Sequence, residues 1–441
     1  MNDLHIYLGI DFGTSGVRAV AIAADGSVQT EVAQSFEQSE ARHLSDTWRH
    51  TLFALLEAVP LSLRQRLKGI AIDGTSSTVL LCDRNGEPVA APILYYDNRG
   101  QSMLGTLSAI APANHPVLSA TSSLAKWLWW CCQAAVNPAS DLKPLSNQFF
   151  LHQADWLSYL LHGQLGISDY NNALKLGYDP ETERYPEWMQ CLPPGPKLPR
   201  VVSPGTAIGT VQAAIAARYA LPLDCQVRAG TTDSIAAFLA SGATQPGEAV
   251  TSLGSSLAVK LLSPDRVDNA RYGIYSHRLG NHWLVGGASN TGGAVLKHYF
   301  SKADLETLSC QIDPQQPSPY HYYPLLQPGE RFPTNDPSLQ PCLEPRPDNP
   351  VDFLHGLLES IARIESEGYR LLQNLGAPPL RRVYTAGGGA RNPTWMAIRQ
   401  RYLQVPVLLP ANTAAAYGSA LLAKGLENTS ARGKNQGFRN S

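Results

Sequence analysis

The stretch Ile6-Tyr-Leu-Gly-Ile-Asp-Phe-Gly-Thr-Ser-Gly-Val-Arg-Ala-Val-Ala-Ile-Ala-Ala-Asp-Gly26 decides how this chain is interpreted. It contains two apolar runs, 6–10 and 17–23, which have strand length and enough β-branched residues to be buried. Between the runs lies a turn of small residues, with one carboxylate, Asp11, at its entrance. The pattern predicts a β-hairpin.

The turn of this hairpin suits phosphate oxygens. Gly13 and Gly16 permit positive φ and a close backbone approach, so N–H groups and the hydroxyls of Thr14 and Ser15 can point outward. Asp11 at the rim can hold a divalent cation against the same phosphates. The alternative is an ordinary hairpin at a sheet edge, in which Asp11 only favours the turn.

A second copy of the pattern favours the phosphate interpretation. The stretch Gly247-Glu-Ala-Val-Thr-Ser-Leu-Gly-Ser-Ser-Leu-Ala-Val-Lys-Leu-Leu-Ser-Pro264 again predicts a strand, a small-residue turn and a strand. Its turn offers Gly254, Ser255 and Ser256 to a phosphate. Two such hairpins, one in each half of the chain, predict two related α/β halves that face each other across a cleft.

Length and composition narrow the class of protein. A chain of 441 residues is too long for one core and suits two domains of about 200 residues each. The net charge is −1 and no basic face is evident, which argues against nucleic acid as a partner. The oligomeric state stays open between a monomer and a homodimer.

Apolar segments and cysteines indicate the cellular compartment in which the protein is expected. A strand begins at about His5 without a cleavable apolar region before it, and the most apolar helical stretch, 124–136, is too short for a membrane span and contains Lys126. Seven cysteines without a CxxC pair are most simply thiols in a reducing cytosol. We therefore expect a cytoplasmic protein without a membrane partner.

The first half continues with mixed elements. Residues 27–36 predict a third antiparallel strand, 45–59 an amphipathic helix and 68–73 a buried strand. That buried strand runs into a turn that carries the hydroxyls of Thr75 and Ser76.

A second polar element follows a strand predicted over 91–95. Asp97 and Arg99 stand at the end of this strand, two residues apart, so both side chains can point to the same side. Such a pair either meets a ligand or closes a surface ion bridge between its own members.

The second half brings one more carboxylate. Residues 225–229 predict a strand that leads into a helix, with Asp233 and Ser234 at or near the helix N-terminus. An Asp in this position is commonly only an N-cap. Farther on, Gly293 opens another predicted helix. Eleven prolines between 314 and 350 exclude regular structure and predict a long ordered loop or a mobile flap.

Three glycines, 387–389, follow a strand predicted over 381–386. Gly388 and Gly389 let a flat ligand lie against bare backbone, and Trp395 is positioned to cover that ligand. Asn392 suits the N-cap of the helix that follows. Glycine-rich turns between a strand and a helix are common, so this motif alone is weak evidence.

Together the motifs resemble those of the FGGY carbohydrate kinases, members of the superfamily of sugar kinases, heat-shock ATPases and actin. The resemblance covers nearly the whole chain, with seven motifs in the family's order. They are the first phosphate loop at 10–15, the sugar-contact element at 94–99 with Tyr95 for the usual Trp, the central signature at 123–127, the catalytic-base segment at 229–233, the second phosphate loop at 252–256, the GERxP stretch at 324–333 and the adenosine site at 386–395.

The resemblance implies two actin-like (ribonuclease H-like) ATPase domains and transfer of the γ-phosphoryl group of ATP to a primary hydroxyl of a sugar. It implies that Asp233 is the base and that Asp11, with Asp233, lies at the Mg²⁺. The implied sugar contacts are Thr75, Ser76, Asp97, Arg99, Asp233 and Ser234. The implied nucleotide contacts are Gly13, Thr14, Ser15, Gly254, Ser255, Ser256, Gly293, Gly388, Gly389, Asn392 and Trp395.

One departure bears on the substrate. Xylulokinases carry Gln-Met-His-Gly after the fourth strand, where this chain has Asp73-Gly-Thr-Ser-Ser77. A hydroxyl-lined turn replaces Met and His, so D-ribulose is expected ahead of D-xylulose, as in the small cyanobacterial and plant sugar kinases that the chain resembles. The alternatives are a D-xylulose kinase or another polyol kinase of the family, a sugar-independent ATPase switch, and a degenerate kinase that binds sugar as a regulator.

The resemblance also divides the chain. We expect a sugar-side domain with the first phosphate loop over 1–228 and a nucleotide-side domain over 229–412. A closing helix is expected over 413–426, and a polar, disordered tail over 427–441.

Overall fold

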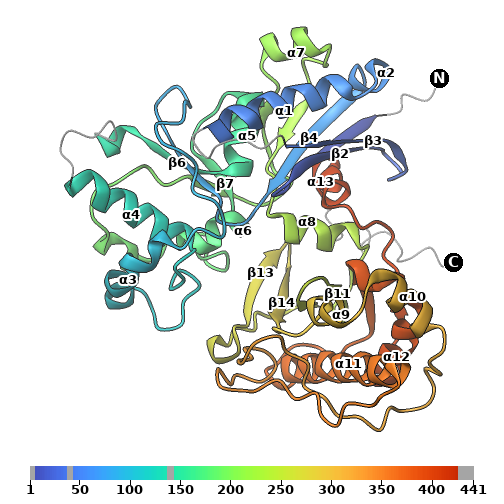
Figure 1. Cartoon of the computed structure of the whole chain (residues 1–441). Helices are drawn as coiled ribbons and strands as arrows, with labels where there is room; N and C mark the ends of the chain where they lie inside the picture. Colours follow the sequence, from blue (N-terminus) through green and yellow to red (C-terminus); the bar gives the residue numbers. More distant parts are fainter. Residues whose placement is uncertain (1–4, 37–42, 137–143, 426–441) are drawn as a thin grey trace, which may run out of the picture.

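The computed structural model describes residues 5–36, 43–136 and 144–425. The polar tail expected over 427–441 lies outside the described residues. Two six-stranded sheets dominate the described chain. Figure 1 shows one sheet above the other, with a short helix, α8, between them.

The first sheet has the strand order β3-β2-β1-β4-β10-β9. The predicted hairpin and third strand are present, and β4 and β10 run parallel to β1. Apolar side chains of α1 and α5 cover one face of the sheet, and those of α13 cover the other. The elements are β1 (Ile6–Phe12), β2 (Gly16–Ala23), β3 (Val28–Ser35), β4 (Leu67–Gly74), β9 (Ala207–Thr210), β10 (Gln226–Arg228), α1 (Leu44–Ala58), α5 (Gln153–His162) and α13 (Ala415–Lys424).

The second sheet has the order β13-β14-β12-β11-β15-β16. Strands β11 and β12 form the second predicted hairpin. Strand β15 runs parallel to β11, just as β4 runs parallel to β1. Helix α11 packs against one face and α8 against the other. The elements are β11 (Glu248–Leu253), β12 (Leu257–Ser263), β13 (Tyr275–Leu279), β14 (His282–Ala288), β15 (Arg382–Ala386), β16 (Val407–Leu408), α8 (Asp233–Ala240), α11 (Pro350–Asn374) and α12 (Pro393–Leu403). The prediction of two related α/β halves is confirmed.

The helix pair α8 and α13 joins the two sheets. After the second sheet the chain returns, and α13 packs on β1, β2 and β4 of the first sheet as well as on α8. Glycines permit this close packing: a Cβ at Gly418 would lie 1.8 Å from the carbonyl oxygen of Ala236, and one at Gly9 would lie 2.0 Å from that of Ala416. The closing helix is thus part of the first sheet's core.

The remaining elements flank these sheets. A lobe built on β5 and β6 contains α3 and α4, and α9 and α10 lie on the second sheet's side. None of the helices in the described ranges is long and apolar enough to cross a membrane. The elements are α2 (Leu61–Arg64), β5 (Val79–Cys82), α3 (Leu104–Ile110), α4 (Ser123–Val136), β6 (Phe149–His152), β7 (Ile167–Asp169), α6 (Tyr170–Ala173), β8 (Arg200–Val202), α7 (Ala213–Tyr219), α9 (Gly293–Tyr299) and α10 (Lys302–Ser309).

The strand predicted over 91–95 is wrong. Only Ile93 pairs, in an isolated bridge to Val79, and the chain then turns into a 3₁₀ helix that begins at Arg99. Pro92 supplies no N–H for a ladder, which explains why pairing does not extend. The proline-dense segment has no helix or strand between α10 and α11, as predicted.

Candidate active site

Three carboxylates lie at one edge of the first sheet. The strands β1, β4 and β10 are parallel neighbours, so their carboxyl ends meet at the same edge. Asp11 stands opposite Asp73 in the register of β1 and β4. Gly74 pairs with Thr232, and Asp233 follows as the first residue of α8. The structure therefore brings Asp11 and Asp233, which sequence reasoning selected, to one place.

A glycine makes this approach possible. A Cβ at Gly230 would lie 1.7 Å from the carbonyl oxygen of Ile72, a distance that no side chain can occupy. The segment between β10 and α8 can therefore lie directly against β4 only because residue 230 is glycine.

The three carboxylates influence one another. Burial raises the pKa of Asp11 above its usual value, and burial together with the charge of Asp11 raises that of Asp73 well above it. The pKa of Asp233 is also raised, chiefly by burial, while the backbone N–H of Ser234 and the positive charge of Lys260 oppose the shift. Asp233 is thus a carboxylate of increased basicity.

Asp73 is hydrogen-bonded to the closing helix, α13. Its Oδ2 accepts a hydrogen bond from Ser419 Oγ at 2.6 Å, whereas its buried Oδ1 receives none from a donor. Asp73 was not among the predicted site residues. The signal was present, because the buried strand 68–73 ends in a carboxylate just as the first strand does.

Asp233 does not occupy the N-cap position of α8. Thr232 is the N-cap residue and makes no side-chain cap, while Asp233 Oδ1 accepts from the N–H of its neighbour Ser234 at 2.5 Å. Lys260, from β12 of the second sheet, donates to the carbonyl oxygen of Ser234 at 2.9 Å. Sequence reasoning missed Lys260, although a lysine within an apolar strand was a visible signal.

The donor set fits a magnesium ion that also binds phosphates. Within the ranges that the structure describes, no group of three or more His, Cys, Asp or Glu side chains is arranged for a metal. Mg²⁺ usually takes one or two protein carboxylates and completes its shell with water and substrate phosphates. Asp11, half-buried beside Asp73, suits that role.

The turn between β1 and β2, which the sequence predicts to be the first phosphate loop, is tight and has an exposed tip. Gly13 N–H donates to the carbonyl oxygen of Gly16 at 3.0 Å, which closes the turn between β1 and β2. Thr14 and Ser15 at its tip are exposed. The turn therefore has the shape expected for contact with an anionic group.

The turn between β11 and β12, predicted to be the second phosphate loop, is bonded to the start of α9. Gly293 N–H donates to the carbonyl oxygen of Gly254 at 2.9 Å, and Ala294 N–H donates to that of Ser255 at 3.0 Å. Gly387 follows β15 with φ of +84°, and a Cβ there would lie 2.6 Å from the carbonyl oxygen of Leu253. The predicted glycines of 254, 293 and 387–389 thus converge at one end of the second sheet.

The proline-dense segment supports this region. Glu330 is buried and accepts hydrogen bonds from Ser289 Oγ at 2.5 Å and from Asn290 N–H at 2.8 Å. Arg331 Nε donates to the carbonyl oxygen of Ala288 at 2.7 Å. The segment is therefore an ordered loop that fixes the chain between β14 and α9.

Trp395 lies behind the glycine turn. Its side chain is 2% exposed, its Nε1 donates to the carbonyl oxygen of Leu358 at 3.2 Å, and a Cβ at Gly389 would lie 2.6 Å from its ring. A ring so enclosed offers no face to a ligand, so the expectation that Trp395 covers one does not fit this placement. Asn392 is the helix N-cap, as predicted, and accepts from Trp395 N–H.

The hydroxyl turn after β4 is tied to α5. Thr75 is buried, and both its N–H and its hydroxyl donate to Gln153 Oε1 at 3.1 Å. Its hydroxyl also lies 2.5 Å from that of Thr78. Ser76 beside it is half-buried. Thr75 therefore sets the shape of the turn.

Asp97 and Arg99 contact each other. Arg99 Nε and a terminal nitrogen donate to the two carboxylate oxygens of Asp97 at 3.0 and 2.7 Å, and the guanidinium stacks on Trp129 at 4.7 Å. These bonds lower the pKa of Asp97. The structure thus contains the ion bridge that the sequence left as an alternative to sugar contact.

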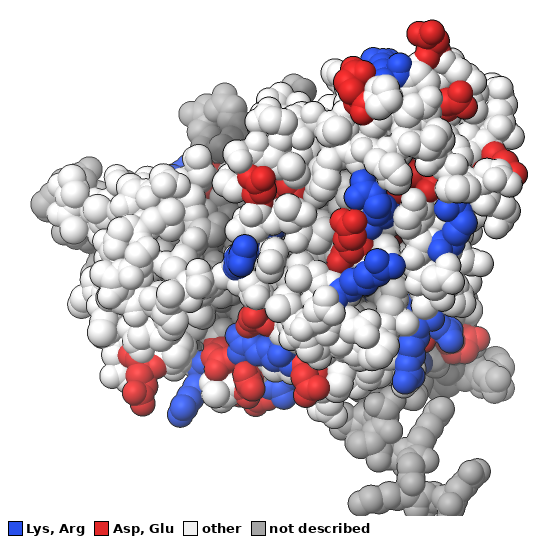
Figure 2. Space-filling model, turned by 90° about the horizontal axis from the view of Figure 1, so that it is seen from below, with Lys and Arg blue, Asp and Glu red and all other residues white. Residues whose placement is uncertain are grey.

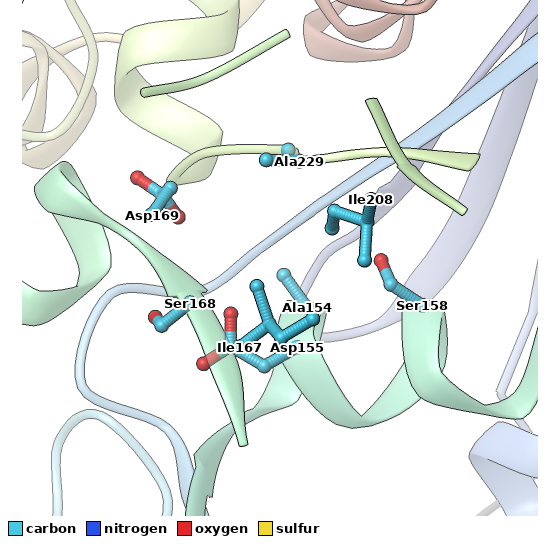
Figure 3. A pocket seen from close by; sticks show the side chains of 9 residues that line it. Ala154, Asp155, Ser158, Ile167, Ser168, Asp169, Ile208 and Ala229 are labelled. Carbon is cyan, nitrogen blue, oxygen red and sulfur yellow. The ribbon is translucent and has the colours of Figure 1, made fainter. Parts of the chain in front are cut away.

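A buried polar cluster lies between α4, α5 and α6. His152 contacts Asp155 through Nδ1 at 2.9 Å and Ser123 through Nε2 at 3.1 Å, and Asp169 caps α6. Burial and the charge of Asp155 raise the pKa of Asp169 to about 7. Figure 3 shows Asp155 and Asp169 around a cavity of about 10 Å³. Such a volume holds about one water molecule and no sugar.

The charge on the surface is mixed. On the face shown in Figure 2, basic and acidic side chains are interspersed, and neither sign forms a continuous patch. This agrees with a net charge of −1.

Comparisons with known proteins identify the family. The N-terminal domain model of the FGGY family of carbohydrate kinases matches residues 6–240, and the C-terminal domain model matches 249–424. The first model therefore includes α8, whereas we expected the boundary after residue 228.

Individual relatives are distant but span the chain. A xylulose kinase of Staphylococcus epidermidis is 21% identical, over 95% of this chain and 87% of the relative. A gluconokinase of Bacillus subtilis is 21% identical, over 98% and 88%. The crystal structure of xylulose kinase from Rhodospirillum rubrum shares the fold, with a TM-score of 0.80, 22% identity and coverage of 95% and 89%. With its two actin-like α/β domains, the chain belongs to the FGGY family of carbohydrate kinases.

Proposed function

We propose that this kinase transfers the γ-phosphoryl group of Mg-ATP to the primary hydroxyl of a ketopentose, D-ribulose ahead of D-xylulose. The observation that carries the proposal is the meeting of Asp233 with Asp11 at one sheet edge, next to a hydroxyl-lined turn. D-ribulose 5-phosphate is then the product.

Asp233 is the general base in this proposal. A primary hydroxyl is almost entirely protonated at pH 7, so a neighbouring carboxylate must accept its proton as the new P–O bond forms. The raised pKa of Asp233 makes it a better acceptor than an exposed aspartate. Ser234, which is exposed at the same helix start, is proposed to contact the sugar.

The phosphates are proposed to lie between the two turns. Gly13, Thr14 and Ser15 approach from the first sheet, and Gly254, Ser255 and Ser256 approach from the second. Mg²⁺, when bound near Asp11, supplies charge neutralisation for the transferred group. The exposed backbone of Gly388, with Gly389, Gly293 and Asn392, is proposed to border the nucleoside.

The choice of sugar rests on the hydroxyl turn. D-ribulose and D-xylulose differ in the configuration at C3, and a site that hydrogen-bonds one epimer leaves polar groups unpaired with the other, at about 1–3 kcal/mol per group. Thr75 and Ser76 replace Met and His here, which favours a different epimer. Because Thr75 is engaged with Gln153, Ser76 is the freer of the two to meet the sugar. Asp97 and Arg99 are proposed to contact the sugar while they remain bonded to each other in their ion bridge.

A second candidate comes from the relatives, whose names specify xylulose and gluconate. The test is kcat/KM for D-ribulose, D-xylulose, L-ribulose, glycerol and D-gluconate under identical Mg-ATP. We expect D-ribulose to exceed D-xylulose by roughly tenfold to a hundredfold, in line with one mispaired group. If another compound exceeds D-ribulose by tenfold, the substrate assignment is wrong while the kinase assignment stands.

The same assay separates the other classes. An ATPase switch would release ADP at the same rate with and without sugar. A sugar-binding regulator would bind a pentulose in calorimetry and release no ADP with any of them. Sugar-dependent ADP release excludes both.

A further inference from the structure

The motif 123–127 resembles the family's central signature, yet no step of the proposed reaction uses it. Its charged member, Lys126 on α4, is 0% exposed and therefore contacts no substrate. Its Nζ donates to the carbonyl oxygen of Ser77 at 2.8 Å and to that of Leu94 at 2.7 Å. Two carbonyl groups 17 positions apart thus share one ammonium group.

Each of these carbonyl groups belongs to a predicted sugar element. Ser77 directly follows Ser76 in the hydroxyl turn, and its φ of +66° lies in the left-handed region that non-glycine residues rarely adopt. Leu94 O also accepts the N–H of Asp97 at 3.0 Å, the bond that closes the turn before Arg99. Lys126 is therefore bonded to the backbone of both elements.

Other contacts tie the same two turns together. Thr78 Oγ1 accepts the N–H of Tyr95 at 3.1 Å and lies 2.5 Å from Thr75 Oγ1. Burial lowers the pKa of Lys126 to about 7, but an amine donates two hydrogen bonds whether it is protonated or neutral. The link between the turns is therefore present on both sides of neutral pH.

We propose that Lys126 is a positioning residue that holds the hydroxyl turn and the Asp97 turn in the relative placement that binds the sugar. The proposal rests on the proposed function, because it takes both turns as sugar contacts. Loss of the two bonds lets the turns separate, which weakens sugar binding while the nucleotide site on the other sheet keeps its geometry.

The test compares Lys126→Met with a matched control. Leu107→Ala removes buried apolar volume from the hydrophobic cluster that also contains Ala125 and Trp127, the neighbours of Lys126, and its side chain makes no hydrogen bond. We expect Lys126→Met to raise the sugar KM about tenfold with the ATP KM unchanged, whereas Leu107→Ala changes neither KM. The sugar is whichever compound the unmodified protein phosphorylates. An unchanged sugar KM in folded Lys126→Met overturns the proposal.

If Lys126→Met does not fold, Thr78→Val provides a second test of the proposal. It removes the second link between the turns with little change in volume, and we expect it also to raise the sugar KM alone. Equal changes in both KM values, or in neither, would overturn the proposal.

A readout without substrate separates this proposal from the proposed function. Amide hydrogen exchange over 94–99 should become faster in Lys126→Met or Thr78→Val and not in Leu107→Ala, because Tyr95 and Asp97 lose the support of their bonds. Unchanged exchange overturns the positioning role even when the sugar assignment holds. Faster exchange in a protein that phosphorylates none of the sugars supports the positioning of the turns and rejects the proposed function.

Discussion

The first and second sheets carry different chemistry at corresponding positions. In the first sheet, Asp11 on β1 stands opposite Asp73 on the parallel strand β4. In the second sheet, Ser252 on β11 stands opposite Ala386 on β15, and glycines follow both strands. One edge is thus acidic and the other is nearly bare backbone.

The difference shows how one topology can divide the work of phosphoryl transfer. Carboxylates suit a cation and a proton, whereas small residues let a ligand approach backbone N–H groups. Helix α8 starts at the acidic edge with Asp233 and packs on both the second sheet and α13. The predictions below test the acidic edge and the glycine edge separately.

The largest effect is expected at the acidic edge, from Asp233→Asn. Loss of a general base should lower kcat by roughly 10²–10⁴-fold while the protein stays folded. Asp46→Asn is the matched control, because Asp46 also lies in the first turn of a helix, α1, and has no role in the proposed site. Steady-state kinetics and a thermal melt decide: kcat within twofold of the unmodified protein would remove Asp233 from this role.

At the glycine edge, Trp395→Ala should act on stability. A large aromatic side chain lost from a core costs about 3–5 kcal/mol of unfolding free energy. Denaturant unfolding measures the loss. If Trp395 instead covered a ligand, the substitution would leave stability nearly intact and raise the nucleotide KM, which would contradict its buried placement.

Asp11→Asn should change the response to Mg²⁺. Loss of one carboxylate beside the ion should raise the Mg²⁺ concentration for half-maximal activity by about 10–100-fold. Calorimetry without nucleotide should give an unaltered sugar affinity, because the proposed partner of Asp11 is the ion. An equal loss of sugar affinity would show that Asp11 belongs to the sugar site.

Two neighbouring glycines allow a finer test of the glycine edge. A Cβ at Gly388 would meet no protein atom within 4 Å, whereas one at Gly389 would collide with Trp395 and Leu253. Gly388→Ala should therefore raise the nucleotide KM about tenfold at constant melting temperature, because only a bound ligand can meet the new methyl group. Gly389→Ala should cost about 1–3 kcal/mol of stability. An unchanged nucleotide KM in Gly388→Ala would mean that the ligand lies elsewhere.

The smallest effect concerns pH. Asp233 must be ionised to act, so activity falls as pH drops through its pKa, which burial raises and Lys260 lowers. Lys260→Met removes the positive charge, raises the pKa of Asp233 further and moves the acidic limb of the kcat/KM profile upward by about one pH unit. The profiles of both proteins from pH 4 to 8 check this. A downward shift, or none, would show that Lys260 does not act on the base.

Much of the fold was predictable because it rests on local patterns. The hairpins at 6–26 and 247–264, the buried strand at 68–73, the helix after Asn392 and the irregular proline-dense segment all appear as expected. The order of seven short motifs identified the family. The strand over 91–95 failed because Pro92 supplies no N–H for a ladder, so that only Ile93 pairs.

For the site, the sequence by itself determined which carboxylates and small-residue turns stand at strand ends, since periodicity and turn residues are local properties of the chain. Only the tertiary structure decided which of them meet. The register of β1 and β4 sets Asp73 beside Asp11, and α13 brings Ser419 to Asp73 from 346 positions away. Packing likewise buries Trp395 behind its turn and directs Lys126 to Ser77 and Leu94. These contacts depend on how distant segments pack together, and no local pattern encodes that packing.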